Sequence, residues 1–317
     1  MSDYFDNTGR DDILTGGIRM IPIQTHAGEF KIWTKRVGNN PRIKVLLLHG
    51  GPGATHEYFA SCDSFFPGAE IEYYYYDQLG SYYSDQPKDD TLYETDRFVE
   101  EIEQVRKALK LDKSNFYLLG HSWGGILAVE YALKYQDNLK GLIISNMMMS
   151  SPEYGKFVKE KLGPKMPPEV LSEILEIEAK KDFDNPRYME LLVPNFYAEY
   201  IIKMPSDEWP EPVNRAFKHL NQDIYTSLWG PSEFGVSGKL ETWDRTQDLD
   251  KIDVPTLVIG ATYDTMDPKH MEWVASQIKH GQFLLCPNGS HMALYDDQET
   301  YFSGLIKFIK SVDQSNR

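Results

Sequence analysis

The first half of the chain alternates short apolar runs with amphipathic segments. This is the pattern of strand–helix–strand units in a mostly parallel sheet. The segment Thr95–Leu111 repeats apolar side chains at helical spacing with charges on its other face, which predicts a helix that covers the sheet. Four apolar runs predict buried strands, and these runs are Val45–His49, Ile71–Tyr76, Phe116–Leu119 and Leu142–Ser145.

Strand signals also lie at the two ends of the chain. Gly17–Ile23 and Glu29–Val37 flank the turn-prone residues His26–Gly28, so we predict an antiparallel hairpin at the edge of the sheet. Two further β-rich runs, Pro255–Gly260 and Gln282–Cys286, come after a long interruption.

That interruption, roughly residues 151–242, is rich in Pro, Glu, Lys, Tyr and Trp and mostly helical in pattern. We therefore predict an α/β fold in which residues 1–150 and 243–317 form the core and residues 151–242 form an inserted helical cap. Open α/β sheets bind ligands at the carboxyl edge of their strands, so the cap is expected over that edge. Helices are predicted at Leu171–Glu178 and Tyr188–Ile202 within the cap and at Gln298–Val312 after it.

The strongest local signal is the run GHSWGG at residues 120–125, which joins a predicted strand to a helical pattern. A Gly-x-Ser-x-Gly motif is common and is often only a turn. Between a strand and a helix it favours a nucleophile elbow, a sharp turn that lifts the serine hydroxyl above the sheet. Side chains in place of the glycines would collide with neighbouring backbone. The motif makes Ser122 the candidate nucleophile.

A serine nucleophile requires a base and a carboxylate that orients the base, and in this kind of fold both follow the serine along the chain. Asp264 lies just past one late strand and His291 just past the next. The competing acid, Asp267, precedes Pro268 and is more typical of a helix N-cap. We therefore predict Asp264 as the orienting acid and His291 as the base.

A third element, HGGPG at residues 49–53, follows the strand that ends at His49. Its glycines allow backbone N–H groups to point at a developing oxyanion, and we expect the N–H groups of Gly51 and Trp123 to form the oxyanion hole. The alternatives are a glycine-rich turn without a role, or a phosphate loop. The second is disfavoured because no Gly-Lys-Ser/Thr follows.

Composition narrows the range of partners. The 317 residues carry a formal charge of −15, which argues against nucleic acid and is typical of an acidic solvated surface. Cys62 and Cys286 are too few for a disulfide framework and form no metal-ligand pair, although a bridge between them stays open. The first twelve residues lack a leader pattern, and no apolar run approaches the ~20 residues that span a bilayer. We expect a cytoplasmic protein that needs no metal or organic cofactor and contacts no membrane.

Taken together, these motifs resemble the proline iminopeptidase (prolyl aminopeptidase) family of α/β-hydrolase serine peptidases, from about Gly17 to Val312. The resemblance implies release of an N-terminal residue, preferentially proline, from small peptides or amino-acid derivatives with a free N-terminus. Related branches cleave amino-acid amides. It rests on HGGPG at 49–53, YDQLG at 76–80, GHSWGG at 120–125, and the late Asp264 and His291.

The resemblance also suggests how a cationic amine would be recognised. A branch of the family that interacts with the tricorn protease carries a glutamate in a Gly-Pro-x-Glu-Phe segment, and GPSEF at residues 230–234 matches it. Glu233 is thus the candidate amine anchor, unless it is only a charge on the cap surface. The same branch has a second glutamate directly after the catalytic aspartate, where this chain has Thr265. Asp267 or Glu199 are candidate substitutes.

Three questions stay open at this level. Aromatic residues of the cap are candidates for a pocket wall, although packing is their commoner role; they are Tyr197, Trp209, Tyr225, Trp229 and Phe234. An esterase or amino-acid amidase with the same catalytic residues would have the same motifs. A non-catalytic ligand-binding module is the third alternative, and the complete set of motifs disfavours it.

Overall fold

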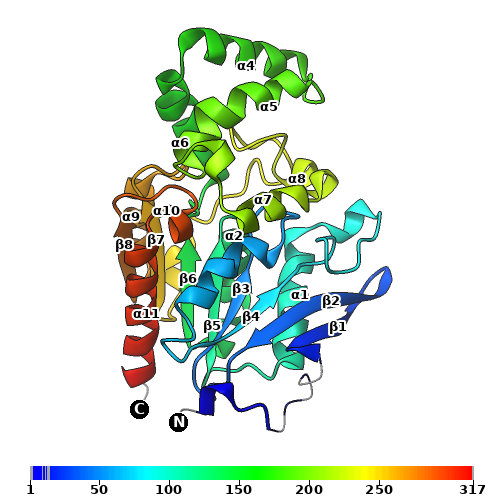
Figure 1. The fold of residues 1–317 in the computed structure, drawn as a ribbon, viewed down its shortest axis with the longest axis vertical. Helices are drawn as coiled ribbons and strands as arrows, with labels where there is room; N and C mark the ends of the chain where they lie inside the picture. Colours follow the sequence, from blue (N-terminus) through cyan, green and yellow to red (C-terminus); the bar gives the residue numbers. More distant parts are fainter. Residues whose placement is uncertain (1–2, 9, 11, 13–14, 316–317) are drawn as a thin grey trace.

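The computed structural model describes residues 3–8, 10, 12 and 15–315, and its centre is an eight-stranded sheet (Figure 1). The strand order is β1-β2-β4-β3-β5-β6-β7-β8. β1 and β2 form the predicted antiparallel hairpin at one edge, β2 runs antiparallel to β4, and the remaining neighbours are parallel. The strands are β1 Ile18–Thr25, β2 Gly28–Val37, β3 Lys44–Leu48, β4 Glu72–Tyr76, β5 Phe116–His121, β6 Gly141–Ser145, β7 Thr256–Ala261 and β8 Gly281–Cys286.

Helices cover the sheet. Every residue of β4, β5, β6 and β7 is buried, as expected for strands between two helical layers. Helix α2 packs on β5 and β6, α9 on β7 and β8, and α11 beside β8. The helices are α1 Thr95–Ala108, α2 Trp123–Tyr135, α3 Ser151–Phe157, α4 Pro168–Lys180, α5 Pro186–Leu192, α6 Ala198–Tyr200, α7 Glu211–Lys218, α8 Gln222–Leu228, α9 Pro268–Gln277, α10 Ala293–Asp296 and α11 Gln298–Ser315.

Helices α3 to α8 lie between β6 and β7 in sequence, and Figure 1 shows them gathered beyond one end of the strands. The helix predicted over Tyr188–Ile202 is interrupted. A π-helical turn, Val193–Tyr197, separates α5 from α6. Pro194 lies in this turn, and because proline has no N–H, a regular hydrogen-bond ladder cannot continue through it.

The junction of α7 and α8 rests on two glycine-containing turns of the core. The N–H of Asn221 donates to the carbonyl of Gly53 at 2.9 Å, and its side-chain amide donates to the carbonyl of Gly80 at 2.8 Å. A Cβ on Gly80 would overlap Ile224 of α8, and one on Gly53 would lie 2.9 Å from the Asn221 carbonyl. The glycines of HGGPG and YDQLG therefore allow these helices to sit directly on the core.

A buried glutamate strengthens the same contact. Glu57 is 3% exposed, forms an ion pair with Arg215 of α7 at 3.0 Å, and lies 2.7 Å from Nδ1 of His219. The hydroxyls of Thr55 and Tyr83, both from the core, also donate to its carboxylate. Removing one partner of such a buried charged group is expected to be costly, because the remaining charge stays buried.

Two features outside the sheet bear on the earlier predictions. Cys62 and Cys286 are both free and buried, so they do not form a bridge. Among the residues that the model describes, no helix is both long enough and apolar enough to cross a membrane.

The close packing of α2 on β3 yields a stability prediction. A Cβ on Gly124 would overlap the backbone carbonyl of Leu48, which cannot move without moving the strand. We expect Gly124→Ala to lower the free energy of unfolding by about 3 kcal/mol, measured by denaturant titration. Gly155 in α3 has open space around its Cα, so Gly155→Ala is the matched control and should be neutral or stabilising. Equal effects of the two substitutions would contradict the packing argument.

Candidate active site

Ser122 occupies a sharp turn between β5 and α2. Its backbone has φ 56° and ψ −127°, a conformation that costs energy for any residue with a side chain. The turn is possible because its neighbours are glycines. A Cβ on Gly120 would overlap the carbonyl of Gly124, and one on Gly50 would lie 2.8 Å from the Ser122 Cβ. The strand–elbow–helix arrangement predicted for GHSWGG is therefore present.

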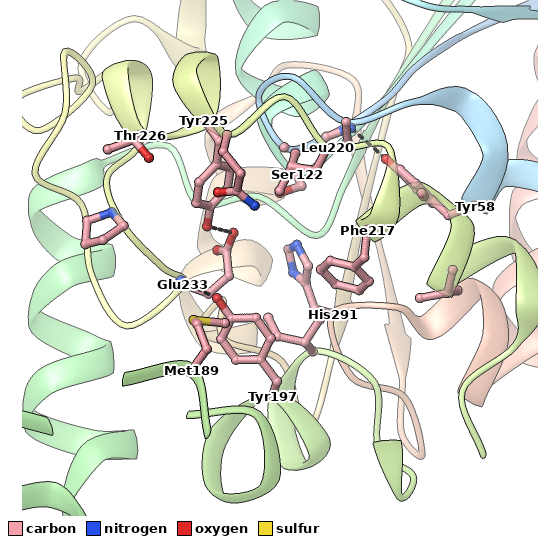
Figure 2. Close-up of a pocket in the computed structure, with 18 of the residues that line it drawn as sticks. Tyr58, Ser122, Met189, Tyr197, Phe217, Leu220, Tyr225, Thr226, Glu233 and His291 are labelled. Atoms are coloured by element: carbon pink, nitrogen blue, oxygen red, sulfur yellow. Dashed lines mark hydrogen bonds between the residues drawn. The ribbon is translucent and has the colours of Figure 1, made fainter. Parts of the chain in front are cut away.

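His291 and Asp264 meet next to this turn. The Nδ1 atom of His291 lies 2.8 Å from Oδ1 of Asp264, and both side chains are almost fully buried. Asp264 follows β7 and His291 follows β8, so adjacent parallel strands deliver them to the same edge of the sheet. In Figure 2 the imidazole of His291 lies between Ser122 and Phe217.

The Asp264 carboxylate is held from several sides. Its Oδ2 accepts a hydrogen bond from the side-chain amide of Asn146 at 2.7 Å, and its Oδ1 accepts one from the N–H of Met266 at 3.0 Å. Asn146 follows β6 and has φ 53°, a left-handed conformation that asparagine tolerates. Sequence reasoning missed Asn146. The only sequence feature that could have indicated Asn146 is its position directly after a strand. No sequence pattern indicates that its side chain contacts Asp264.

Electrostatics favour the protonated form of His291. Burial works against the imidazolium, but the charge and hydrogen bond of Asp264 outweigh it, with Glu233 and Asp296 adding to the effect. The pKa of His291 is therefore raised above its ordinary value. The neutral imidazole, which is the form able to accept a proton, is lost as the pH falls through this raised pKa.

A buried chain of hydrogen bonds ties the glycine-rich loop to His291. The N–H of Gly50 donates to the hydroxyl of Tyr58 at 2.7 Å, and this hydroxyl lies 3.0 Å from Nδ1 of His121. The Nε2 atom of His121 lies 2.9 Å from the His291 carbonyl. Burial and the nearby His291 lower the pKa of His121 to about 3, so its ring stays neutral. This series of hydrogen bonds requires the Tyr58 hydroxyl to donate to Nδ1 of His121. It also requires Nε2–H of His121 to donate to the His291 carbonyl.

The same chain bears on the predicted oxyanion hole. The N–H of Gly50 is occupied by Tyr58, and the described residues supply no acceptor for the N–H of Gly51 or Trp123. Gly51 has φ 108°, which favours glycine. The indole of Trp123 donates to the Gln78 side chain at 2.8 Å, and Gln78 also donates to the His49 carbonyl. Gln78 thus joins HGGPG to GHSWGG and fixes their spacing.

Glu233 lies in the cavity that contains the Ser122 hydroxyl, and tyrosines surround it. Its Oε1 accepts a hydrogen bond from Tyr225 at 2.6 Å, and Oε2 lies 3.3 Å from the hydroxyl of Tyr154. Burial raises the pKa of Glu233, while His291 and the two tyrosine hydrogen bonds oppose this rise. Figure 2 shows the Glu233 carboxylate beside Tyr225 and facing the region of His291.

The cavity has a volume of about 670 Å³, within the range of small-molecule sites. Its floor is formed by Gly50, Gly51, Ser122 and His291. Helices α5, α7 and α8 and the preceding turns supply mostly apolar walls, including Phe183, Met189, Val213, Ala216, Phe217 and Leu220. The cavity is therefore largely apolar, and the partly buried Glu233 carboxylate shares it with Ser122.

The structure separates the remaining candidates. Of the five cap aromatics, Tyr197 and Tyr225 line the cavity, whereas Trp209, Trp229 and Phe234 do not. Asp267 caps α9 by accepting from the N–H of Lys269, and Glu199 is exposed and away from the cavity wall, so neither replaces a second anchor. Thr265 is fully buried beside Asp264. No group of three or more His, Cys, Asp or Glu among the described residues is arranged to hold a metal.

A family model of the alpha/beta hydrolase fold matches residues 44–298, and this defines the class of protein. Among solved structures, VinJ superposes with a TM-score of 0.85 at 26% identity, covering 93% of this chain and 99% of VinJ. A proline iminopeptidase of Mycobacterium smegmatis has a TM-score of 0.84 at 23% identity, covering 95% and 100%, which supports the fold.

Sequence relatives are closer. A proline iminopeptidase of Flavobacterium johnsoniae is 61% identical over 294 residues, which are 93% of this chain and 98% of that protein. One of Elizabethkingia meningoseptica is 59% identical over 296 residues, again 93% and 98%. The chain belongs to the proline iminopeptidase family of α/β-hydrolases.

The charges around His291 yield a titration prediction. We expect NMR titration of its imidazole to give a pKa above the ordinary value of about 6.5, and Glu233→Gln to lower that pKa because one of the stabilising negative charges is removed. Glu199→Gln changes an exposed carboxylate away from the cavity wall and is the control. A pKa that does not respond to Glu233→Gln would show that the two groups are not coupled.

Proposed function

We propose that this chain is a serine exopeptidase that releases an N-terminal residue, preferentially proline, from small peptides with a free amine. The observation that carries the proposal is the placement of the partly buried Glu233 carboxylate in the same cavity as Ser122 and His291. A neutral acyl group gives no reason for a carboxylate in a mostly apolar cavity, whereas a cationic amine does. The relatives named proline iminopeptidase support the same conclusion.

The chemistry proceeds through an acyl-enzyme. Nε2 of His291 takes the proton of the Ser122 hydroxyl as Oγ attacks the carbonyl carbon of the first residue. Asp264, bound to Nδ1, fixes the imidazole tautomer and stabilises the imidazolium. His291 then gives the proton to the leaving amine. Water, activated by the same base, hydrolyses the ester and frees the amino acid. No metal or cofactor takes part in these steps.

The oxyanion that forms in each half-reaction is proposed to lie between two backbone donors, the N–H groups of Gly51 and Trp123. Both donors belong to rigid turns, so little reorganisation is needed when charge develops on the oxygen. Donors of this kind contribute about 2.7 to 4 kcal/mol each to transition-state stabilisation.

Amine binding is linked to the state of the base. The Glu233 carboxylate contributes to the raised pKa of His291 in the free enzyme. A substrate ammonium group paired with Glu233 compensates that negative charge, so the pKa of His291 falls when substrate binds. The correct substrate thereby increases the fraction of neutral base beside Ser122. Residues 151–242 are proposed to act as the cap that encloses this step, because their helices form most of the cavity wall.

The nucleophile assignment is tested with proline arylamide. Ser122→Ala should lose at least about a thousandfold in kcat/KM, because the acyl-enzyme cannot form, while the thermal unfolding midpoint stays close to that of the wild type. A fluorophosphonate probe should label the wild type at Ser122 and leave the variant unlabelled. Turnover that survives the substitution would exclude this mechanism, and absence of labelling in the wild type would favour a non-catalytic module.

The substrate class is tested with Glu233→Gln. We expect at least a tenfold loss of kcat/KM on proline arylamide, because the ammonium group loses its charge-assisted hydrogen bond, and little change on a neutral p-nitrophenyl ester. An N-blocked proline arylamide should be a poor substrate for the wild type. Equal losses on the amine and the ester would argue for an esterase or a general amidase instead. Glu199→Gln again serves as the matched control.

A further inference from the structure

Glu233 lies in a segment that no helix or strand holds. Residues 230–238 lack regular secondary structure, so its backbone groups need partners from elsewhere. The N–H of Glu233 donates to the hydroxyl of Tyr197 at 3.0 Å, and the carbonyl of Glu233 accepts from the hydroxyl of Tyr154 at 2.6 Å. Two tyrosine hydroxyls therefore form hydrogen bonds with Glu233, one with its backbone N–H and one with its backbone carbonyl.

Tyr154 differs from Tyr197 in what lies behind it. It is fully buried in α3 with its ring 5.2 Å from that of Trp229, so its hydroxyl has little freedom to move. This hydroxyl also lies 3.3 Å from Oε2 of Glu233. A single fixed hydroxyl therefore contacts both the backbone carbonyl and the carboxylate of Glu233.

We propose that Tyr154 is a positioning residue that fixes the Glu233 carboxylate within the cavity that Ser122 and His291 also line. This inference rests on the proposed exopeptidase function.

The geometry explains why such a residue is needed. The scissile carbonyl must reach Ser122 while the amine of the same residue reaches Glu233. The separation of Ser122 and Glu233 therefore selects substrates in which a single amino-acid residue carries both the free amine and the scissile carbonyl. An anchor on an unsupported loop would hold that separation loosely, and a misplacement of about 1 Å can cost a hundredfold in rate. Tyr225 fixes only the end of the side chain, through Oε1.

The test is Tyr154→Phe, with kcat and KM measured on proline arylamide and on a neutral p-nitrophenyl ester. We expect KM for the arylamide to rise about tenfold through loss of the hydrogen bonds, and kinetics on the ester to change less than twofold. Tyr197→Phe, which removes the hydroxyl that accepts from the N–H of Glu233, should produce a loss with the same selectivity. Tyr131→Phe, which removes an equally buried hydroxyl bound to Glu103 far from the cavity, is the control.

The pH dependence of kcat/KM is a further test, because a merely structural role of Tyr154 would leave it unchanged. The titratable groups that face Glu233 are Tyr154, Tyr197, Tyr225, His291 and Asp264. Loss of the Tyr154 hydrogen bond raises the pKa of Glu233 further, so the acidic limb of kcat/KM on the arylamide should move to higher pH and that on the ester should not.

The outcomes are distinct. Equal losses on the two substrates, or no loss on either, would overturn the positioning role. If Tyr154→Phe does not fold, Tyr197→Phe decides by the same comparison. Failure of the proposed function itself would appear in the wild type, as absence of turnover on proline arylamide.

Discussion

The structure depends on how closely three backbone segments approach one another around Ser122. The end of β3, the end of β5 and the start of α2 meet where Gly120 and Gly124 have no side chains. A single Cβ at either position would overlap a carbonyl oxygen. This contact holds Ser122 at its positive φ, and it also brings the HGGPG turn within reach of the serine. The strained turn costs free energy, and the burial of the central strands of the sheet offsets that cost.

A second layer of buried polar contacts converts this turn into a defined site. Tyr58 and His121 connect Gly50 to the backbone of His291, while Asn146 and Met266 hold Asp264. Most of these groups lie in the interior, where an unsatisfied hydrogen-bonding group is costly, so each one restricts its neighbour's orientation. The result is that His291 is fixed by its ring, through Asp264, and by its backbone carbonyl, through His121.

Residues 151–242 contribute in a different way, because their helices form most of the cavity wall. Asn221 rests on Gly53 and Gly80, and Glu57 pairs with α7. The contacts of Asn221 touch the HGGPG and YDQLG segments. Glycines that look like simple turn residues therefore have a second role, since they leave room for helices α7 and α8 above the HGGPG turn. Chamber walls and reaction centre are thus parts of one packed unit.

The pattern of apolar runs was sufficient to predict the α/β fold, the edge hairpin, the inserted helices and the strand ends at which Ser122, Asp264 and His291 lie. These features depend on local periodicity and on rules of parallel sheets, which a sequence contains directly. Sequence did not reveal Asn146, Tyr58 or Tyr154, nor which aromatics face the chamber, nor the π-helical turn at Val193–Tyr197. Those contacts join residues tens to more than a hundred positions apart, and only the tertiary packing of distant segments brings them together. Local spacing limits where each side chain can point, and long-range packing selects its partner.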